Sequence, residues 1–439
     1  MTTHTINVGQ TSIPHPLIAL VKSLPKSSTL KAGDSVVISF GREFVYLSTL
    51  TLLASWRKSL LPGIDVKVDD HNSLSATQNM ITNSGFREIV DTGHESPSVQ
   101  RRFGKLPLRP LTNRLNKDSV VQDITSILSD NTALIDDIKP LTTILSEICE
   151  NALTHSGFAS PGYVCATVTE NDQKRRIEIA ICDSGMGFRG SYLSGTNEEV
   201  KARIARGASP IEIAIDGLNS SKPIATPSSV VSYFGFGLYI TRRLVEENRG
   251  QLFILSHSDG MMLNNRARTN IDVQVEFPGT LVVIILDLDN PLPLEAIYEE
   301  AVEGYTGIPT KQINTPDNQI AGKVHQNIPL PKKQEANETK HDVKEAAVIE
   351  LRHFGTELLT REAGLAIRAE LATQALVRGS VIVDLDGISD ITPSVADEAF
   401  GKLAEKMGLE TFERTITFRG GTTLASRLIE FVMKTRLKS

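Results

Sequence analysis

The sequence holds few cysteines, no long apolar run and no excess of basic residues. Its three cysteines, Cys149, Cys165 and Cys182, lack the spacing of a metal site, which favours small buried side chains in a reducing cytosol. The longest apolar runs, such as LVVIIL, are too short to span a bilayer, and the opening residues lack the apolar core of a signal peptide. We therefore expect a cytoplasmic protein without a membrane segment.

The charge balance is slightly acidic, with a formal net charge of −6. Because no basic field attracts a phosphate backbone, a nucleic-acid partner is not expected. Hydrophobic residues make up 40% of the chain and charged residues 22%, as in ordinary globular domains. The 439 residues suffice for two to four domains, each with its own core.

The first part of the chain predicts a small α/β domain over residues 1–100. Short apolar strands such as Asp34–Phe40 alternate with helical patterns such as Leu47–Gly63. The stretch from 93 to 112 is rich in proline and basic residues, which is typical of a connector.

A larger segment, residues 113–294, follows with an opening helix and a hairpin predicted around the turn NDQK. Residues 305–345 are polar and lack periodicity, which predicts a linker. Residues 346–439 return to alternating strands and helices and predict a second small α/β domain. Three separate strands are expected late in the larger segment, at Gln251–Ser256, Ile271–Phe277 and Thr280–Leu286.

The helical stretch LSEICENALTHSG, Leu145–Gly157, carries Glu147, Asn151 and His155 at four-residue intervals, so all three lie on one helix face. The amide oxygen of Asn151 is a suitable ligand for a Mg²⁺ ion that bridges phosphates. Glu147 can orient or deprotonate a water molecule, or polarise another nucleophile.

Two glycine motifs supply complementary chemistry. In CDSGMGF, Asp183 ends an apolar strand and can accept a hydrogen bond from an exocyclic amine, while Gly185 and Gly187 let the backbone approach a flat ring. In YFGFGLYITRRL, Gly235 and Gly237 directly precede a helix, whose free N–H groups and dipole favour a phosphate. Each motif alone is a weak signal, but their order and context favour one nucleotide site.

The chain resembles the GHKL ATPase superfamily in four stretches and in their order. These stretches are EICENALTHS, DSGMG, GFGL and FPGTLVVIIL. This superfamily includes gyrase, the large heat-shock chaperone, histidine kinases and the MutL mismatch-repair protein. The resemblance spans roughly residues 113–294 and implies a helix-on-sheet sandwich that binds ATP·Mg²⁺ under a lid at residues 188–234. The implied fold class is α/β (α+β), with this ATP-binding sandwich flanked by two small α/β domains.

The resemblance also implies a role for each matching residue. Glu147 is the implied catalytic carboxylate, Asn151 the Mg²⁺ ligand and Asp183 the adenine anchor. The residues implied to line the nucleotide are Gly185 and Gly187 at the adenine, Gly235, Gly237 and Leu238 at the phosphates, and Thr280 near the adenine through water.

Two further nucleotide contacts have alternatives. His155 falls where some kinases place an aromatic or basic residue near the nucleotide, but it is equally compatible with a partly buried helix histidine. The lid sequence has helical periodicity, and its Lys222 could reach the γ-phosphate on closure. The alternative for Lys222 is a solvated lysine before a proline.

The flanking domains resemble STAS-like domains, relatives of the anti-anti-sigma fold. VIVDLDGISDITPSVADEAFGKL (Val381–Leu403) is similar to that family's strand-turn-helix core, and VVISFGREFVYLSTLTLLASW is a weaker match. The resemblance implies surfaces that bind a protein partner. In anti-anti-sigma proteins a serine at the start of this helix is phosphorylated, usually within the sequence Asp-Ser-Ser-Gly. Neither segment here keeps that sequence, so no regulated phosphorylation is expected at Ser48. Ser394 and Asp397 have the spacing of a helix capping box, which favours a capping role for Ser394.

These features leave three functions open. The first is an ATP-binding, slowly hydrolysing switch in which ATP orders the lid and repositions the flanking domains. The second is a serine/threonine protein kinase of the anti-sigma-factor type, and the third is a non-hydrolysing, nucleotide-bound scaffold. A histidine kinase is not expected, because no suitable helix with a histidine and a following acidic residue precedes residue 113. By analogy with GHKL ATPases, a nucleotide-dependent homodimer is expected.

Overall fold

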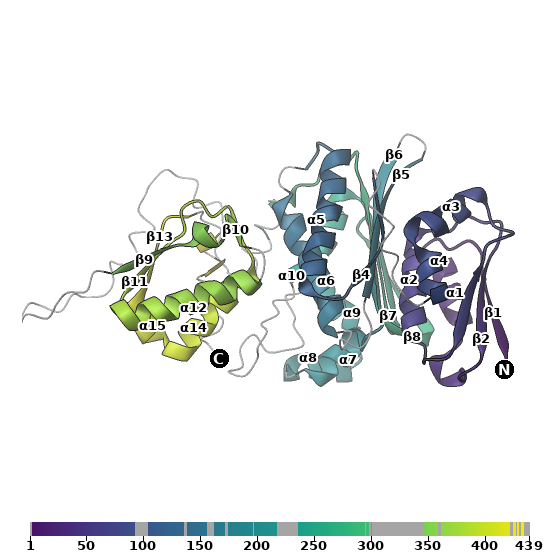
Figure 1. Ribbon diagram of the computed structural model, residues 1–439, viewed down its shortest axis with the longest axis horizontal. Helices are drawn as coiled ribbons and strands as arrows, with labels where there is room; N and C mark the ends of the chain where they lie inside the picture. Colours follow the sequence, from purple (N-terminus) through teal and green to yellow (C-terminus); the bar gives the residue numbers. More distant parts are fainter. Residues whose placement is uncertain are drawn as a thin grey trace, which may run out of the picture. The chain divides into compact units, whose positions relative to one another are not determined.

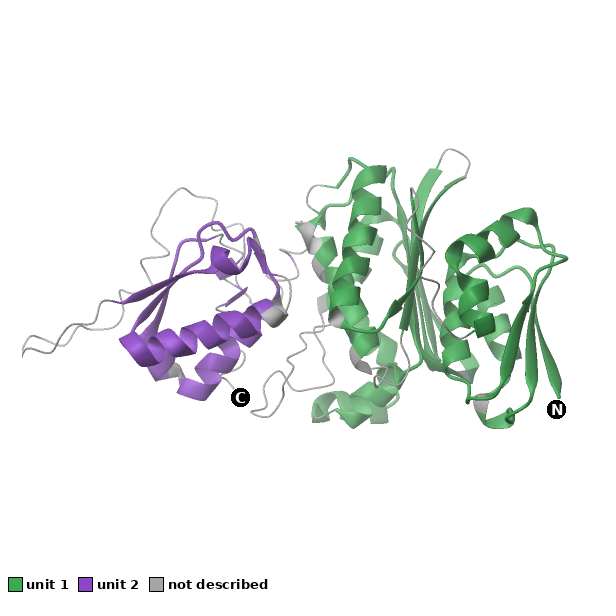
Figure 2. Cartoon of the chain, in the orientation of Figure 1, with its two compact units in different colours: residues 1–223, 233–298 green, residues 224–232, 299–439 purple. Residues whose placement is uncertain are grey.

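The chain forms two compact units in a computed structural model (Figures 1 and 2). The first unit comprises residues 1–223 and 233–298, and the second comprises 224–232 and 299–439. The linker predicted at 305–345 lies outside the described residues. The structure describes residues 2–92, 104–135, 138–155, 162–171, 174–195, 197–216, 236–294, 296–297, 300, 346–358, 361–421, 425–426, 428–429 and 432–433.

The N-terminal domain is a three-stranded parallel sheet in the order β1-β2-β3. In β2 the residues Val36, Ile38 and Phe40 are buried and alternate with less buried ones, so the period of two seen in the sequence gives the sheet one fully buried face. The elements are β1 (Thr3–Val8), α1 (His15–Ser23), β2 (Ser35–Phe40), α2 (Leu47–Lys58), β3 (Asp65–Asp69), α3 (Ser75–Ser84) and α4 (Phe86–Thr92).

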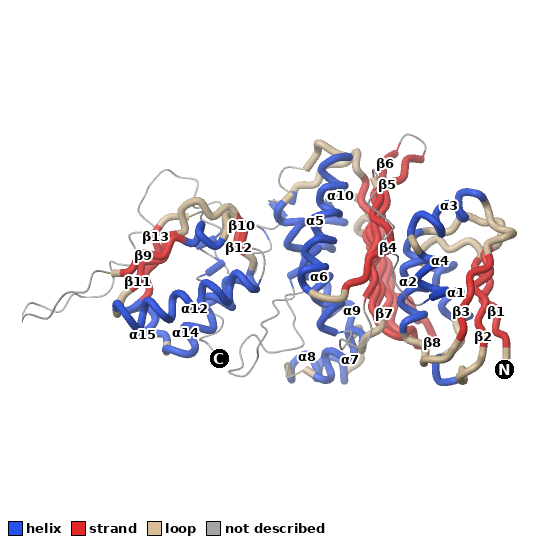
Figure 3. The backbone as a smooth tube through the Cα atoms, in the orientation of Figure 1, coloured by secondary structure: helices blue, strands red, loops and turns tan. Residues whose placement is uncertain are grey.

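The central domain is a five-stranded antiparallel sheet in the order β4-β5-β6-β8-β7. Three helices, α5, α6 and α10, lie on one side of this sheet (Figure 3). The fold class expected from the sequence is confirmed. The elements are β4 (Lys105–Leu111), α5 (Arg114–Asn131), α6 (Lys139–His155), β5 (Gly162–Asn171), β6 (Lys174–Asp183), α10 (Phe236–Asn248), β7 (Gln251–Asn264) and β8 (Ala267–Asp287).

Two expectations about this sheet are wrong. Lys105–Leu111 is not part of a connector, because it forms the edge strand β4. Its prolines are tolerated at a sheet edge, where one side of the strand needs no partner, and the pairing shifts register between Leu106 and Arg109. The three short strands expected at 251–286 are two long ones, since β7 and β8 pair as one hairpin that continues to Asn264 and Ala267.

The segment between the two glycine motifs is helical where the structure describes it, as its periodicity predicts. Three short helices form, each with apolar residues turned inward, while residues 217–234 of the expected lid lie outside the described part of the chain. These helices are α7 (Gly187–Ser194), α8 (Glu198–Ala205) and α9 (Pro210–Asp216).

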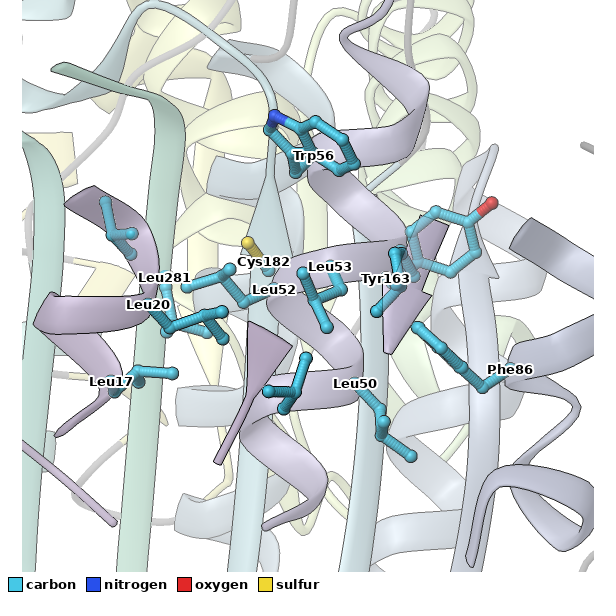
Figure 4. Close-up of a cluster of buried hydrophobic side chains, with 14 of the residues drawn as sticks. Leu17, Leu20, Leu50, Leu52, Leu53, Trp56, Phe86, Tyr163, Cys182 and Leu281 are labelled. Carbon is cyan, nitrogen blue, oxygen red and sulfur yellow. The ribbon is translucent and has the colours of Figure 1, made fainter. Parts of the chain in front are cut away.

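Helix α2 joins the N-terminal domain to the central sheet. Every residue from Leu47 to Trp56 is buried, and a helix that is buried all round needs a partner on each face. One partner is the N-terminal sheet, and the other is the side of the central sheet that α5, α6 and α10 leave uncovered. Figure 4 shows Leu50, Leu53 and Trp56 of α2 in one apolar cluster with Cys182 and Leu281 of the central sheet.

A polar contact accompanies this apolar packing. The backbone N–H of Ser48, in the first turn of α2, donates to a carboxylate oxygen of Glu178 in β6 at 2.9 Å. Burial raises the pKa of Glu178, and the hydrogen bonds from Ser48 oppose that shift. Because a helix N-terminus favours negative charge, this contact fixes where the helix meets the sheet.

The second unit contains a three-stranded parallel sheet in the order β13-β11-β9 and a two-stranded parallel sheet of β10 and β12. The helix after β11 begins at Pro393, and the Thr392 hydroxyl accepts a hydrogen bond from Val395 N at 3.3 Å. The helix therefore starts before Ser394, and the capping role predicted for Ser394 is wrong. The elements are β9 (Ala347–Glu350), β10 (Glu357–Leu358), α12 (Arg361–Arg378), β11 (Val381–Asp384), β12 (Asp390–Ile391), α13 (Pro393–Ala396), a π-helix (Asp397–Gly401), α14 (Lys402–Met407), α15 (Leu409–Thr415) and β13 (Ile416–Arg419).

In the described residues no helix combines the length and the apolar character that a membrane crossing requires.

The packing of α2 predicts a difference between two leucine substitutions. Leu53 is fully buried, whereas Leu115 of α5 is 83% exposed. We expect Leu53→Ala to lower the free energy of unfolding by about 2–5 kcal/mol, because it leaves a cavity in the shared core. The matched variant Leu115→Ala should change it by less than about 0.5 kcal/mol. Urea denaturation of the full chain measures both, and equal effects would contradict the shared core.

Candidate functional site

Helix α6 presents Glu147 and Asn151 one turn apart, as the sequence spacing predicts. Its apolar side, which includes Leu141, Ile144 and Leu145, is buried, so the opposite face is left for polar residues. Glu147 and Asn151 are both partly exposed. His155 is the last residue of α6, and its side chain lies outside the described residues.

The second glycine motif lies directly against Glu147. Gly237 is in the first turn of α10, and a Cβ placed on it would lie 3.0 Å from the Cβ of Glu147 and 3.2 Å from its Oε2 atom. Only glycine leaves this space open between the helix N-terminus and the carboxylate. The next residue, Leu238, is buried at the start of the same helix, and Thr241 donates to the Gly237 carbonyl at 2.6 Å.

The first glycine motif surrounds a buried carboxylate. Asp183 ends β6, is 6% exposed, and accepts a hydrogen bond from the Gly185 N–H at 2.7 Å. Burial raises the pKa of Asp183 to about 7, although backbone hydrogen bonds from Gly185 and Thr280 oppose the shift. A buried carboxylate with few charged neighbours is poised to accept a hydrogen bond from a ligand.

The backbone crowds Asp183 from two sides. Gly279 has a φ of +111°, and a Cβ on it would lie 2.0 Å from the Asp183 carbonyl oxygen. A Cβ on Gly162 would lie 3.6 Å from the Cβ of Ala152 and 3.7 Å from that of Asp183. Since Ala152 is the residue after Asn151, helix α6 passes Asp183 at one point and Gly237 at another.

Two residues of β7 support the first glycine motif and carry no signal in the sequence. The Ser256 hydroxyl accepts a hydrogen bond from Phe188 N at 2.9 Å and lies 3.3 Å from the Thr280 hydroxyl. His257 has a φ of +53° at a register shift of β7, and its Nε2 lies 3.4 Å from the Gly185 carbonyl oxygen. A Cβ on Gly187 would collide with both residues, so this glycine is required by packing as well as by its positive φ. The positions of Ser256 and His257 depend on a bulge that forms where β7 pairs with β8. No local sequence motif predicts this bulge.

The structure therefore places most of the predicted residues in two groups that helix α6 connects. Thr280 pairs in register with Asp183, which places both at one end of the sheet. Of the remaining predicted residues, Lys222 and Gly235 lie outside the described part of the chain. One group, Glu147 with Gly237 and Leu238, lies at the start of α10, and Asn151 lies one turn further along α6. The other group, Asp183 with Gly185, Gly187 and Thr280, lies at the end of β6.

Within the described ranges, no group of three or more His, Cys, Asp or Glu side chains could hold a metal ion by itself. A divalent ion at this site would need oxygen ligands from a bound molecule. The partly exposed amide of Asn151 fits a Mg²⁺ ion that is held chiefly by phosphates and water.

The pKa of Asp183 predicts how stability depends on pH. The folded state retains a proton up to about pH 7, whereas the unfolded chain releases it near the ordinary value of 3.8. The contribution of Asp183 to the stability of the nucleotide-free protein therefore falls as the pH rises from about 4 to about 7. Asp183→Asn removes this contribution, so the Tm of the variant relative to the wild type should be several degrees higher at pH 8 than at pH 4. A Tm difference independent of pH in thermal unfolding would contradict the buried carboxylate.

The close approach of Gly279 to Asp183 predicts a severe effect of a single methyl group. Gly207 has a comparable φ of +92°, but a Cβ on it meets no atom of the described residues within 4 Å. We expect Gly207→Ala to cost about 1 kcal/mol of unfolding free energy from backbone strain alone, and Gly279→Ala to cost more than about 3 kcal/mol. Denaturation of the two variants measures the difference, and similar costs would refute the steric argument.

Comparison with known protein families gives two matches. Residues 136–290 match the family described as histidine kinase-, DNA gyrase B-, and HSP90-like ATPases, and residues 363–423 match a family described as a STAS-like domain of unknown function. The comparison with curated proteins finds no match. Both resemblances stated for these segments are thus confirmed, while that of the N-terminal domain stays a prediction. The chain carries a GHKL-type ATPase domain and a C-terminal STAS-like domain.

Proposed function

We propose that this protein binds ATP together with Mg²⁺, hydrolyses the ATP slowly, and acts as a nucleotide-driven switch. One observation carries the proposal: helix α6 runs past the buried Asp183 at one point and past Gly237, at the N-terminus of α10, at another. A carboxylate that can accept a hydrogen bond from an amine and a helix N-terminus that favours phosphate thus lie along one helix. A nucleotide carries an amine on its base at one end and phosphates at the other, so the two groups suit its two ends.

Asp183 would recognise the adenine. Its burial disfavours the charged carboxylate, so a ligand N–H that donates to it restores an interaction lost with water. Thr280 and Gly185 flank it and would hold the ring or its bound water. Gly279 lets its strand approach the Asp183 backbone, and Gly187 leaves room for Ser256 and His257.

Glu147 would act on the terminal phosphate. It lies beside the first turn of α10, whose N–H groups and dipole attract phosphate oxygens. There its carboxylate can orient a water molecule or take up its proton as the water attacks. Asn151 would contribute one oxygen to Mg²⁺, which offsets the charge of the phosphates.

The two flanking domains would have different tasks. The N-terminal domain shares a core with the ATPase sheet, so its helix α2 is not available to a partner. The C-terminal STAS-like domain forms its own compact unit and is the better candidate for binding a protein partner. If ATP binding drives homodimerisation, a second copy would dock away from the sheet face that α1 and α2 cover.

Incubation of the purified chain with γ-labelled ATP tests the proposal and separates its alternatives. We expect label to appear as free phosphate. Glu147→Ala should lower the rate of release by about 100-fold or more while ATP still binds, because general-base catalysis contributes that much. Label on a protein side chain would instead indicate a kinase, and tight binding without turnover would indicate a scaffold.

Glu150→Ala is the matched control. Glu150 lies on the same helix, one turn from Glu147, but pairs with Lys117 at 3.2 Å. Its loss should leave phosphate release near the wild-type rate. Equal losses in the two variants, or a wild-type chain that binds no ATP, would refute the assignment.

A further inference from the structure

Helix α2 turns a row of small polar residues toward the central sheet. The residues Ser48, Thr51 and Ser55 are spaced by three and four positions, so they share one helix face. All three are buried, which for polar side chains requires partners. The Ser48 side chain bonds to Glu178, as its backbone N–H does. The Thr51 hydroxyl donates to the Leu47 carbonyl and contacts the Cys165 sulfur, and the Ser55 hydroxyl contacts that of Ser184.

The contact at Ser55 reaches the candidate site, because Ser184 directly follows Asp183. The Ser184 hydroxyl donates to the Ser55 carbonyl oxygen at 2.7 Å, and the two hydroxyl oxygens lie 3.0 Å apart. A hydroxyl has one proton, so Ser184 has none left for the second bond. Ser55 must therefore be the donor there, and the two serines form a reciprocal pair.

The end of α2 explains why the Ser55 carbonyl accepts this bond. The last four carbonyl groups of a helix have no partner within it. Here α2 ends at Lys58, and the Ser59 N–H donates to the Trp56 carbonyl instead of that of Ser55. Ser184 thus satisfies a helix carbonyl of another domain.

Ser55 also contacts the residue before Asp183. The Cys182 thiol, whose pKa is raised by burial, lies within hydrogen-bond reach of the Ser55 side chain, although Ser55 gives its one proton to Ser184. Side chains alternate along a strand, so Cys182 faces α2 while Asp183 faces α6, where Ala152 lies. Ser55 therefore lies against both chain neighbours of Asp183 on the α2 side of the sheet, and it bonds to Ser184 by a hydrogen bond in each direction.

We propose that Ser55 is a positioning residue for the adenine anchor, and hence that the N-terminal domain is part of the nucleotide site's support. The inference rests on the proposed function of Asp183. Ser55 does not touch the nucleotide. It fixes Ser184, and through it the direction in which the Asp183 carboxylate points.

ADP binding to the full chain tests this role. Ser55→Ala should raise the Kd for ADP about three- to tenfold, the range expected when one positioning hydrogen bond is lost. The rate of phosphate release at saturating ATP should change much less, since Glu147 is untouched. Thr51→Val is the matched control, because it removes a buried hydroxyl from the same helix face but contacts β5. It should lower Tm as Ser55→Ala does and leave the Kd for ADP at the wild-type value.

A second pair of variants guards against misfolding at the buried Ser55. Ser184 is partly exposed, so Ser184→Ala should fold and show the same weaker ADP binding, whereas Ser184→Thr keeps the hydroxyl and should bind more tightly than Ser184→Ala. The double variant of Ser55→Ala and Ser184→Ala should bind no more weakly than either single one. Wild-type ADP affinity in both alanine variants overturns the inference alone. Failure of the wild type to bind ADP and ATP overturns the proposed function as well.

Discussion

The burial of α2 between two sheets is the constraint on which the rest of the first unit depends. Because both faces of the helix are covered, neither sheet has a complete core without it. Glu178 at its first turn and Ser184 near its end fix its position along the sheet as well as its distance from it. The boundary expected near residues 100–113 therefore divides two sequence patterns but not two independent cores.

The candidate site depends on backbone approaching backbone. Gly279, Gly187 and Gly237 each stand where a single methyl group would strike Asp183, His257 or Glu147. Two serines outside the site bond to the first glycine motif. Ser256 in β7 accepts a hydrogen bond from the Phe188 N–H, and the Ser55 hydroxyl in α2 bonds to that of Ser184. This packing keeps the carboxylate of Asp183 away from water, which is why its pKa is raised.

Much of the fold and site could be predicted from local sequence. The hairpin of β5 and β6, the helix that carries Glu147 and Asn151, and the helices after Gly187 follow from periodicity and turn residues. Pairing between strands that are far apart in the sequence leaves no such local signal. The prolines of Lys105–Leu111 are typical of a connector, but they are also compatible with an edge strand, because proline is excluded only from central strands. Ser256, His257 and Ser55 could not be found, since their importance arises only from contacts with residues far along the chain.

The partners of α2 also bear on how the chain is made. Ser48 and Glu178 are 130 residues apart in sequence. At synthesis rates of about 5–20 residues per second, α2 leaves the ribosome roughly 7–26 s before β6 does. During that interval its sheet-facing side has no sheet to cover it. The nascent N-terminal domain therefore exposes this side of α2 to water until the central sheet has been synthesised.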